Sequence, residues 1–338
     1  MRLHVSSTFA SILFAASCQS TAPAPSPPPV PTASLGERPS APGELLLRGI
    51  RDGLFWVGDG SYMAMFLVGP DGVAVVDAPP TLDAGFRDAI ASVTDRPVTH
   101  LVYTHHHGDH IGGAGRFRQT DPGVQVIAHA DTAAALARGG ACTDCISVPD
   151  PRPAPDVTFA DTHSIDLGGG QVLELAHHGA NHTQGNLFVH APNHATLMLV
   201  DVVYPGWVPF DLIAVSEDIP GYVSATDRAL SYDFDTFVGG HVARPGTRAE
   251  VRAARDYLDD LKRAARRALS NNTRARMIPE LVEETGTDNG WWLTARHTEA
   301  VTRQCAAELR ARWTGRLAGV ETYADDHCKR MQFSLRID

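Results

Sequence analysis

The segment Thr104-His-His-His-Gly-Asp-His110 decides how the rest of the chain is interpreted. It follows the apolar run Val98–Tyr103, which is typical of a strand, so a loop carries the segment at that strand's end. Imidazoles and carboxylates are ligands that zinc accepts without sulfur, and one loop can turn several of them towards one point. The pattern therefore predicts a metal site. Its candidate ligands are His105, His107, Asp109 and His110.

Three further residues of the ligand types occur downstream, each at one end of an apolar run. His182 precedes one run, Asp201 ends another, and His241 follows a third. Taken singly, each has an ordinary alternative, because isolated histidines are often core or surface residues and aspartates often begin turns. Four ligands do not complete two metal sites, however. We therefore expect these three residues to converge on the histidine-rich loop.

The apolar pattern predicts strands alternating with helices up to about residue 246, and helices alone beyond it. We therefore expect an α/β domain over residues 43–246 and a helical C-terminal region over residues 247–338. Strands are expected at 61–68, 73–77, 98–103, 124–128, 172–176, 186–190, 196–200 and 236–239. Helices are expected at 81–93, 111–118, 129–138, 220–230, 247–269 and 291–317.

The order of these motifs resembles that of the metallo-β-lactamase superfamily. The resemblance covers about residues 53–246, and its most specific part is the HxHxDH box of residues 105–110. It implies an α/β fold of the αββα sandwich type with two metal ions at one edge, and it aligns Asp77 with a residue that supports the ligand loop. It also implies ligand roles, with His105, His107 and His182 on the first ion, Asp109, His110 and His241 on the second, and Asp201 between them.

Two Zn²⁺ ions held in this way imply hydrolysis. A hydroxide shared by two cations is available near neutral pH and can attack a carbonyl carbon. Asp109 would orient the hydroxide and carry its proton, so no serine or cysteine nucleophile is needed. We expect cleavage of an ester, lactone or amide bond in a small molecule. Two alternatives remain open: a β-lactamase, and a non-catalytic metal-binding lipoprotein of the cell envelope.

Tyr204 bears on the substrate class. Relatives that are β-lactamases with a cysteine metal ligand carry a lysine three residues later, whereas Asp201 and Tyr204 stand at those positions here. The spacing Asp201-Val-Val-Tyr204 is similar to that of acyl-homoserine lactone hydrolases, whose tyrosine reaches the substrate carbonyl. Tyr204 is therefore a candidate catalytic residue, with an ordinary strand-edge aromatic as the alternative. Thioester hydrolases of the glyoxalase II type share the same ligand set.

Composition restricts the partners. Aspartate and glutamate number 39 against 29 lysines and arginines, which gives a formal net charge of -10. Such a charge argues against a partner held by phosphate contacts, so we expect a small-molecule substrate and no nucleic acid. No apolar run approaches the roughly 18 residues that a membrane-spanning helix needs.

The first 42 residues are typical of an export signal followed by a tether. Residues 1–17 contain a short apolar core that ends in small residues, Cys18 follows, and residues 18–42 are rich in proline. We expect export to the periplasm or cell envelope, with membrane contact only through a lipid on Cys18. An even number of cysteines remains, which favours disulfides in an oxidising compartment. These are Cys142, Cys145, Cys305 and Cys328.

Overall fold

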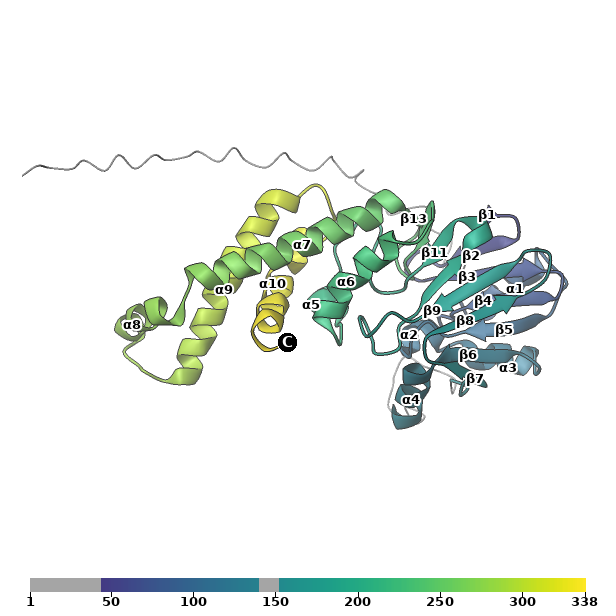
Figure 1. The fold of residues 1–338 in the computed structure, drawn as a ribbon, viewed down its shortest axis with the longest axis horizontal. Coiled ribbons are helices and arrows are strands. Elements are labelled where there is room, and N and C mark those ends of the chain that lie inside the picture. Colours follow the sequence, from purple (N-terminus) through teal and green to yellow (C-terminus); the bar gives the residue numbers. More distant parts are fainter. Residues whose placement is uncertain (1–43, 140–151) are drawn as a thin grey trace, which may run out of the picture.

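The structure is a computed structural model that describes residues 44–139 and 152–338. The expected signal peptide, the proline-rich tether and the pair Cys142 and Cys145 lie outside the described residues. In the described part, two sheets pack face to face at one end of the molecule, and long helices extend from them (Figure 1).

The first sheet has seven strands in the order in which they occur along the chain. Its first four strands pair antiparallel, and its last four pair parallel. Parallel neighbours need crossover connections, and helices supply them here. The strands are β1 (Leu46–Arg51), β2 (Leu54–Gly58), β3 (Met63–Gly69), β4 (Gly72–Val76), β5 (Val98–Val102), β6 (Gln125–His129) and β7 (Val157–Phe159).

The second sheet has six strands in the order β13-β12-β11-β10-β9-β8. All neighbours pair antiparallel except β11 and β12, which are parallel and are connected through α6 (Ile219–Leu230). The strands are β8 (Thr162–Asp166), β9 (Val172–Ala176), β10 (Phe188–Ala191), β11 (Thr196–Met198), β12 (Thr236–Val238) and β13 (Gly246–Thr247).

Alternate residues of the central strands enter different cores, because successive side chains of a strand point to opposite faces. On β3, Met65 packs between the two sheets, whereas Phe66 packs under α1 (Asp83–Ala91) and α3 (Ala114–Thr120). On β11, Met198 lies between the sheets and Leu197 faces α6 and the long helix that follows β13. Two sheets with helices on both outer faces form an αββα sandwich, which confirms the expected fold class.

The helix expected at 111–118 is in fact two helices, α2 (Gly108–Ile111) and α3. The break falls at Gly113, whose N–H donates to the carbonyl of Ala78 over 2.8 Å. A Cβ atom at Gly113 would lie only 3.0 Å from that carbonyl oxygen. The close approach of two backbones therefore ends α2 and ties the histidine-rich loop to the chain after β4.

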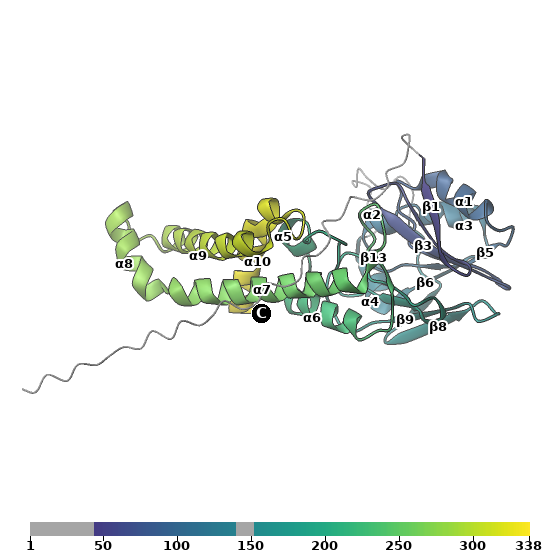
Figure 2. The same cartoon turned by 90° about the horizontal axis from the view of Figure 1, so that it is seen from above.

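Four helices form the C-terminal region and extend from one end of the sandwich (Figure 2). The first begins with a capping box between Thr247 and Glu250. A disulfide joins Cys305 to Cys328 and so links the third helix to the fourth. None of the described helices is both long and apolar enough to cross a bilayer. The helices are α7 (Arg248–Asn271), α8 (Arg274–Thr285), α9 (Gly290–Trp313) and α10 (Val320–Ile337).

Candidate metal centre

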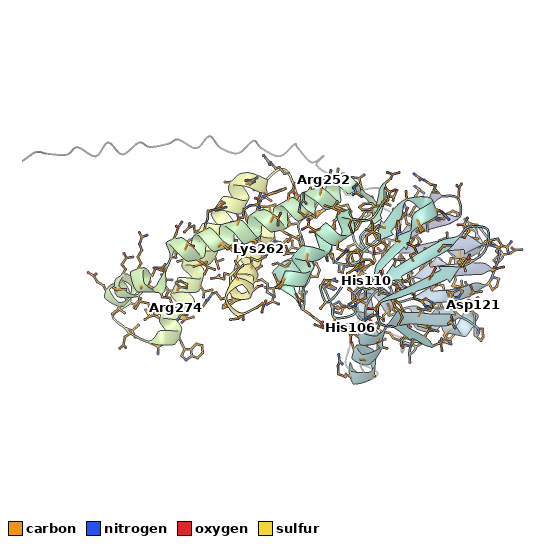
Figure 3. All side chains as sticks on the ribbon, in the orientation of Figure 1. His106, His110, Asp121, Arg252, Lys262 and Arg274 are labelled. Atoms are coloured by element: carbon orange, nitrogen blue, oxygen red, sulfur yellow. A yellow bond between two sulfur atoms is a disulfide. The ribbon has the colours of Figure 1, made fainter. Side chains whose placement is uncertain are left out.

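The histidine-rich loop leaves the carboxyl end of β5, in the middle of the parallel half of the first sheet. Its backbone is fixed at both ends, since the Thr104 carbonyl accepts from the N–H of Leu187 and the His110 carbonyl accepts from the N–H of Ala78. The loop's His106 and His110 lie at the end of the sandwich that faces the C-terminal helices (Figure 3). The loop therefore bridges the two sheets at one edge.

The three downstream residues reach the same edge from the second sheet. His182 lies before β10, Asp201 follows β11, and His241 follows β12. Backbone bonds hold the last two in position, because the N–H of Asp201 donates to Gly239 and the N–H of Met63 donates to Gly240. All seven residues singled out by spacing lie together, and we call them the edge cluster. They are His105, His107, Asp109, His110, His182, Asp201 and His241.

One part of the edge cluster consists of three histidines and a carboxylate. His182 Nε2 lies 3.0 Å from His107 Nδ1 and 3.2 Å from Asp201 Oδ2. His105 Nε2 lies 3.6 Å from the same carboxylate oxygen. Ligands of one tetrahedral zinc ion, with bonds of about 2 Å, lie about 3.3 Å from one another. These four side chains therefore have the spacing and chemistry to hold one ion.

The other part contains Asp109, His110 and His241. The Nε2 atoms of the two histidines lie 3.1 Å apart, and Asp109 Oδ2 lies 3.6 Å from His110 Nε2. Asp201 contacts this part as well, with Oδ2 at 3.1 Å from His110 and Oδ1 at 3.0 Å from His241. A single carboxylate thus contacts both parts of the edge cluster.

In the first part of the edge cluster, a buried ring nitrogen has no hydrogen-bond partner. His105 Nε2 is buried and has no hydrogen-bond partner, an arrangement that a bound cation would satisfy. Burial, with help from neighbouring imidazoles, lowers the pKa of His105 well below its usual value and that of His107 to about 3. Both rings are therefore neutral at pH 7, which is the state that binds a metal ion.

Charge attraction dominates around Asp201. Burial opposes ionisation of this carboxyl, but the imidazoles of His110 and His182 outweigh it and hold the pKa well below its usual value. Burial likewise opposes a charge on His110, yet the Asp201 carboxylate raises the pKa of that imidazole to about 9. The centre of the edge cluster therefore attracts positive charge.

Asp77 supports the loop from beneath. Its side chain is fully buried and accepts from the N–H of Thr104 over 2.8 Å and from the Thr104 hydroxyl over 2.7 Å. The same hydroxyl lies 3.1 Å from His105 Nδ1. Burial raises the pKa of Asp77 to about 6. Asp77 therefore orients the ligand loop through Thr104 and does not itself reach the edge cluster.

Tyr204 is buried beside Asp201, and its hydroxyl donates to Asp201 Oδ1 over 3.3 Å. Burial and the nearby carboxylate raise the pKa of Tyr204 well above its usual value, so its hydroxyl stays protonated. Tyr204 also lines a cavity of about 580 Å³ next to Asp109 and His241. The candidate catalytic tyrosine thus lies between the edge cluster and the space in which a substrate can bind.

Sequence reasoning missed most of this cavity's wall. Tyr62 lines it and packs on the His241 ring with centroids 4.7 Å apart. Burial and the charge of Asp109 raise the pKa of Tyr62. No spacing rule points to single aromatic residues far apart along the chain, so nothing in the sequence singled them out. The other aromatic residues of the wall are Trp207, Phe210 and Tyr323.

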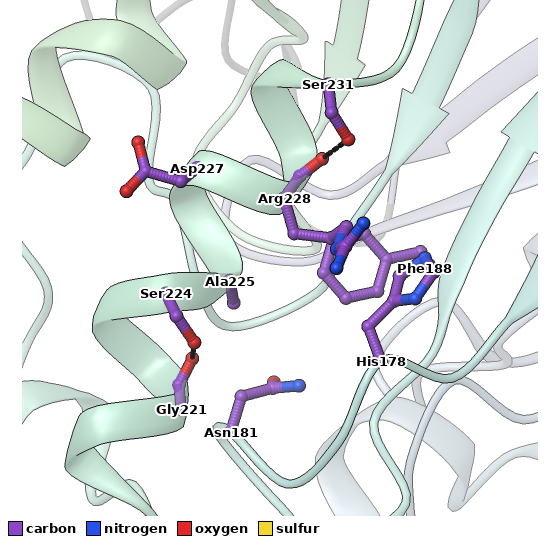
Figure 4. A pocket seen from close by; sticks show the side chains of 9 residues that line it. All are labelled: His178, Asn181, Phe188, Gly221, Ser224, Ala225, Asp227, Arg228 and Ser231. Atoms are coloured by element: carbon purple, nitrogen blue, oxygen red, sulfur yellow. Dashed lines mark hydrogen bonds between the residues drawn. The ribbon is translucent and has the colours of Figure 1, made fainter.

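A second cavity, of about 340 Å³, lies between α6 and β10 (Figure 4). Its serines are already engaged, because Ser224 donates to the Gly221 carbonyl and Ser231 to the Arg228 carbonyl. His178 Nε2 lies 2.7 Å from the Tyr232 hydroxyl. This cavity therefore holds no serine paired with a histidine base, and the edge cluster remains the candidate site.

The comparisons with known proteins agree with this geometry. Residues 57–265 match the family model "Metallo-beta-lactamase superfamily". A metallo-beta-lactamase from Pontibacter korlensis has a similar fold, with a TM-score of 0.53 and 21% identity over 64% of this chain and 99% of that chain. The chain is also 29% identical over 198 residues to 2,4-dinitroanisole O-demethylase subunit alpha of Nocardioides sp. (strain JS1661).

That alignment covers 58% of this chain and 57% of the relative, so the chain spans little more than half of the relative's length. The family match, in contrast, extends over well more than half of the 338 residues and includes the whole edge cluster. The chain therefore belongs to the metallo-β-lactamase superfamily, an enzyme family whose members are generally metal-dependent hydrolases.

Proposed function

We propose that the protein is a dinuclear zinc hydrolase that cleaves an ester, lactone or amide bond in a small molecule. The observation that carries this proposal is the carboxylate of Asp201, which contacts both parts of the edge cluster. The first ion would be held by His105, His107 and His182. Asp201 would be a ligand of both ions. The ligands of the second ion would be Asp109, His110 and His241. An imidazole-rich site without sulfur suits zinc.

Bound there, two divalent cations would lower the pKa of a shared water and polarise the scissile carbonyl. Asp109 faces the 580 Å³ cavity and can take up the proton that this water releases. The Tyr204 hydroxyl, held in its neutral form, is a donor for the oxygen of the substrate carbonyl. Asp109 would thus accept a proton, and Tyr204 would donate a hydrogen bond.

A second candidate reaction is cleavage of an aryl ether. The support is the similarity to 2,4-dinitroanisole O-demethylase subunit alpha, since 2,4-dinitroanisole is a methyl ether of an aromatic ring. β-Lactam hydrolysis receives less support, because the described residues that line the cavity include neither lysine nor arginine to bind a β-lactam carboxylate. The alternative that is not an enzyme is a non-catalytic metal-binding lipoprotein of the cell envelope.

Metal analysis and a substrate panel test the proposal together. Purified protein supplemented with zinc should bind two equivalents, whereas fewer than one equivalent would reject the dinuclear site. The panel should contain nitrocefin, an acyl-homoserine lactone, an aryl ester, a glutathione thioester and 2,4-dinitroanisole. No turnover of any member by zinc-loaded protein would favour the non-catalytic alternative. Tyr204→Phe should lower turnover of the best substrate by roughly tenfold if its hydroxyl donates to the carbonyl.

We also propose export and lipid attachment at Cys18. The disulfide between Cys305 and Cys328 supports an oxidising compartment, because such bonds are rare in the cytosol. Labelling of cells with radioactive palmitate tests this. The full-length chain should take up label and Cys18→Ser should not; an unlabelled full-length chain would contradict the lipid anchor.

A further inference from the structure

The cavity beside the edge cluster has aromatic walls. Besides Tyr62 and Tyr204, it is lined by Trp207, Phe210 and Tyr323, and none of the described residues that line it is a lysine or an arginine. Its titratable lining groups in the described part of the chain are Asp109, His241 and tyrosines. Away from the edge cluster, an anionic group of a substrate would find no counter-charge in these described walls, whereas an uncharged aromatic ring would find rings to stack on.

One wall comes from the C-terminal helical region. Tyr323 lies in the first turn of α10, directly after Gly319. A Cβ atom at Gly319 would lie 3.2 Å from the ring of Trp207 and 3.2 Å from the ring of Tyr323. The two rings therefore lie side by side over a glycine, and the C-terminal region completes a wall that begins on the sandwich.

Backbone hydrogen bonds fix this junction. The N–H of Val208 donates to the Ala318 carbonyl over 3.0 Å, and the N–H of Ala318 donates to the Gly206 carbonyl over 2.9 Å. The loop that carries Trp207 is thus bonded to the segment that begins α10. Because the bonds run in both directions, neither segment can shift without breaking them.

Phe210 is also held by α10. His327 Nε2 donates to the Phe210 carbonyl over 3.4 Å, while the Tyr257 hydroxyl lies 2.7 Å from His327 Nδ1. After Phe210 the backbone makes a left-handed turn, α5 (Asp211–Ala214), which L-residues adopt only where their surroundings enforce it. Arg330 of α10 donates to the Ser216 carbonyl over 3.1 Å and so holds the far end of this turn.

We propose that α10 is part of the substrate site and that the substrate carries an uncharged aromatic group beside the bond that is cleaved. That group stacks against Trp207, Phe210 and Tyr323, and Tyr323 is a specificity residue. His327 and Arg330 are positioning residues that act through the Phe210 segment. The inference rests on the proposed hydrolase function only in taking this cavity as the substrate site.

A binding measurement tests the inference without turnover. With metal-free protein, in which a carboxylate cannot bind zinc, equilibrium dialysis should give a lower Kd for 1-naphthol than for 1-naphthoate, because the two differ mainly in charge. Tyr323→Ala should raise the Kd for 1-naphthol roughly tenfold. Tyr323→Phe should retain binding because it keeps the ring. Trp291→Ala is the matched control, since Trp291 is 87% exposed and belongs to another helix, α9.

Steady-state kinetics give the second readout. With phenyl acetate, Tyr323→Ala should raise KM roughly tenfold, and the control Trp291→Ala should leave KM unchanged. For methyl acetate, which has no ring, the effect of Tyr323→Ala should be smaller. The wild-type protein should prefer phenyl acetate to 4-carboxyphenyl acetate. Circular dichroism of each variant checks folding.

The outcomes separate the two proposals. If naphthol binding depends on Tyr323 but the protein hydrolyses no member of the substrate panel, the proposed hydrolase function would be rejected and the aromatic site would be retained. Ester hydrolysis with equal Kd and KM in Tyr323→Ala and wild type would overturn the role of α10. Preferred binding of 1-naphthoate would overturn the uncharged aromatic substrate.

Discussion

Among the residues that the structure describes, the edge cluster and a second group of histidine and aspartate side chains differ in what their ring nitrogens contact. In the edge cluster, His105 Nε2 is buried without a hydrogen-bond partner. In the second group, called the His129 group and composed of His129, Asp131 and His177, the candidate ligand atoms also lie within 4.8 Å of one another. Their residue types are therefore the same as those of the edge cluster.

Three of the four ring nitrogens in the His129 group are hydrogen-bonded to the backbone. His129 Nε2 donates to the Ala160 carbonyl over 2.7 Å, and its Nδ1 accepts from the N–H of Asp131 over 3.1 Å. His177 Nε2 donates to the Gln184 carbonyl over 2.8 Å. A metal ion would have to displace some of these bonds. The partners of the ring nitrogens, rather than the residue types, thus distinguish the two groups, because nitrogens of the edge cluster face one another and the Asp201 carboxylate.

The largest effect is expected from Asp201→Asn. The substitution removes the carboxylate that contacts both parts of the edge cluster, so zinc content should fall below one equivalent and turnover about 10³-fold or more. Mass spectrometry of metals and initial rates measure both. Asp131→Asn in the His129 group is the matched control and should change neither quantity. Equal losses of zinc and turnover in the two variants would show that the edge cluster and the His129 group do not differ in metal binding.

Asp109→Asn separates metal binding from proton transfer within the edge cluster. Because Asp109 can take up the proton of the attacking water, turnover should fall about 10²-fold or more. The loss of zinc should be confined to the second ion, and the circular dichroism spectrum should not change. Wild-type turnover by this variant would exclude Asp109 as the proton acceptor.

Like His129, His327 has hydrogen-bond partners at both ring nitrogens. Burial lowers the pKa of His327 from 6.5 to about 4. Its unfolded form therefore binds a proton more readily, and the free energy of unfolding should fall as pH falls from 6.5 towards 4. The difference in pKa corresponds to roughly 3 kcal/mol.

Urea unfolding at several pH values measures this effect. His327→Gln should reduce the dependence of the free energy of unfolding on pH between 6.5 and 4. Variants of the edge cluster should leave this contribution in place. An identical pH dependence in wild type and His327→Gln would mean that His327 is not held neutral by its surroundings.

The smallest effect is expected from His129→Gln. Zinc content should remain at two equivalents, because the His129 nitrogens hold the backbone rather than an ion. The free energy of unfolding should fall by about 1 kcal/mol, since the hydrogen bonds of one buried side chain are weakened. Loss of a zinc equivalent in this variant would show that the His129 group binds metal after all.

Much of the sandwich could be predicted from the sequence. The strand expected at 172–176 coincides with β9, and the helix expected at 220–230 differs from α6 by one residue. β1 and β8 were missed, because each alternates buried with exposed positions too irregularly to stand out. The helix expected at 291–317 ends at Trp313, where the chain turns through Gly315 with a φ of +79°.

The residues of the edge cluster could be named in advance, and their metal binding stays a prediction until it is measured. Histidine and aspartate at strand ends leave a pattern in the sequence because ligand types and spacing are local properties. The aromatic residues of the cavity wall leave no such pattern in the sequence. Tyr62 and Tyr323 lie more than 250 positions apart, and only packing of α10 against the sandwich brings them to one cavity.

The amino-acid sequence by itself determined the order of strands and helices and the chemical types that gather at one edge of the sheets. These follow from apolar periodicity and from neighbouring residues, which act over short stretches of chain. The tertiary structure alone decided which nitrogens keep a free lone pair, which carboxylate contacts both parts of the edge cluster, and which rings surround the cavity. Each of these depends on contacts between distant segments, and burial and hydrogen bonding exist only once those segments have packed.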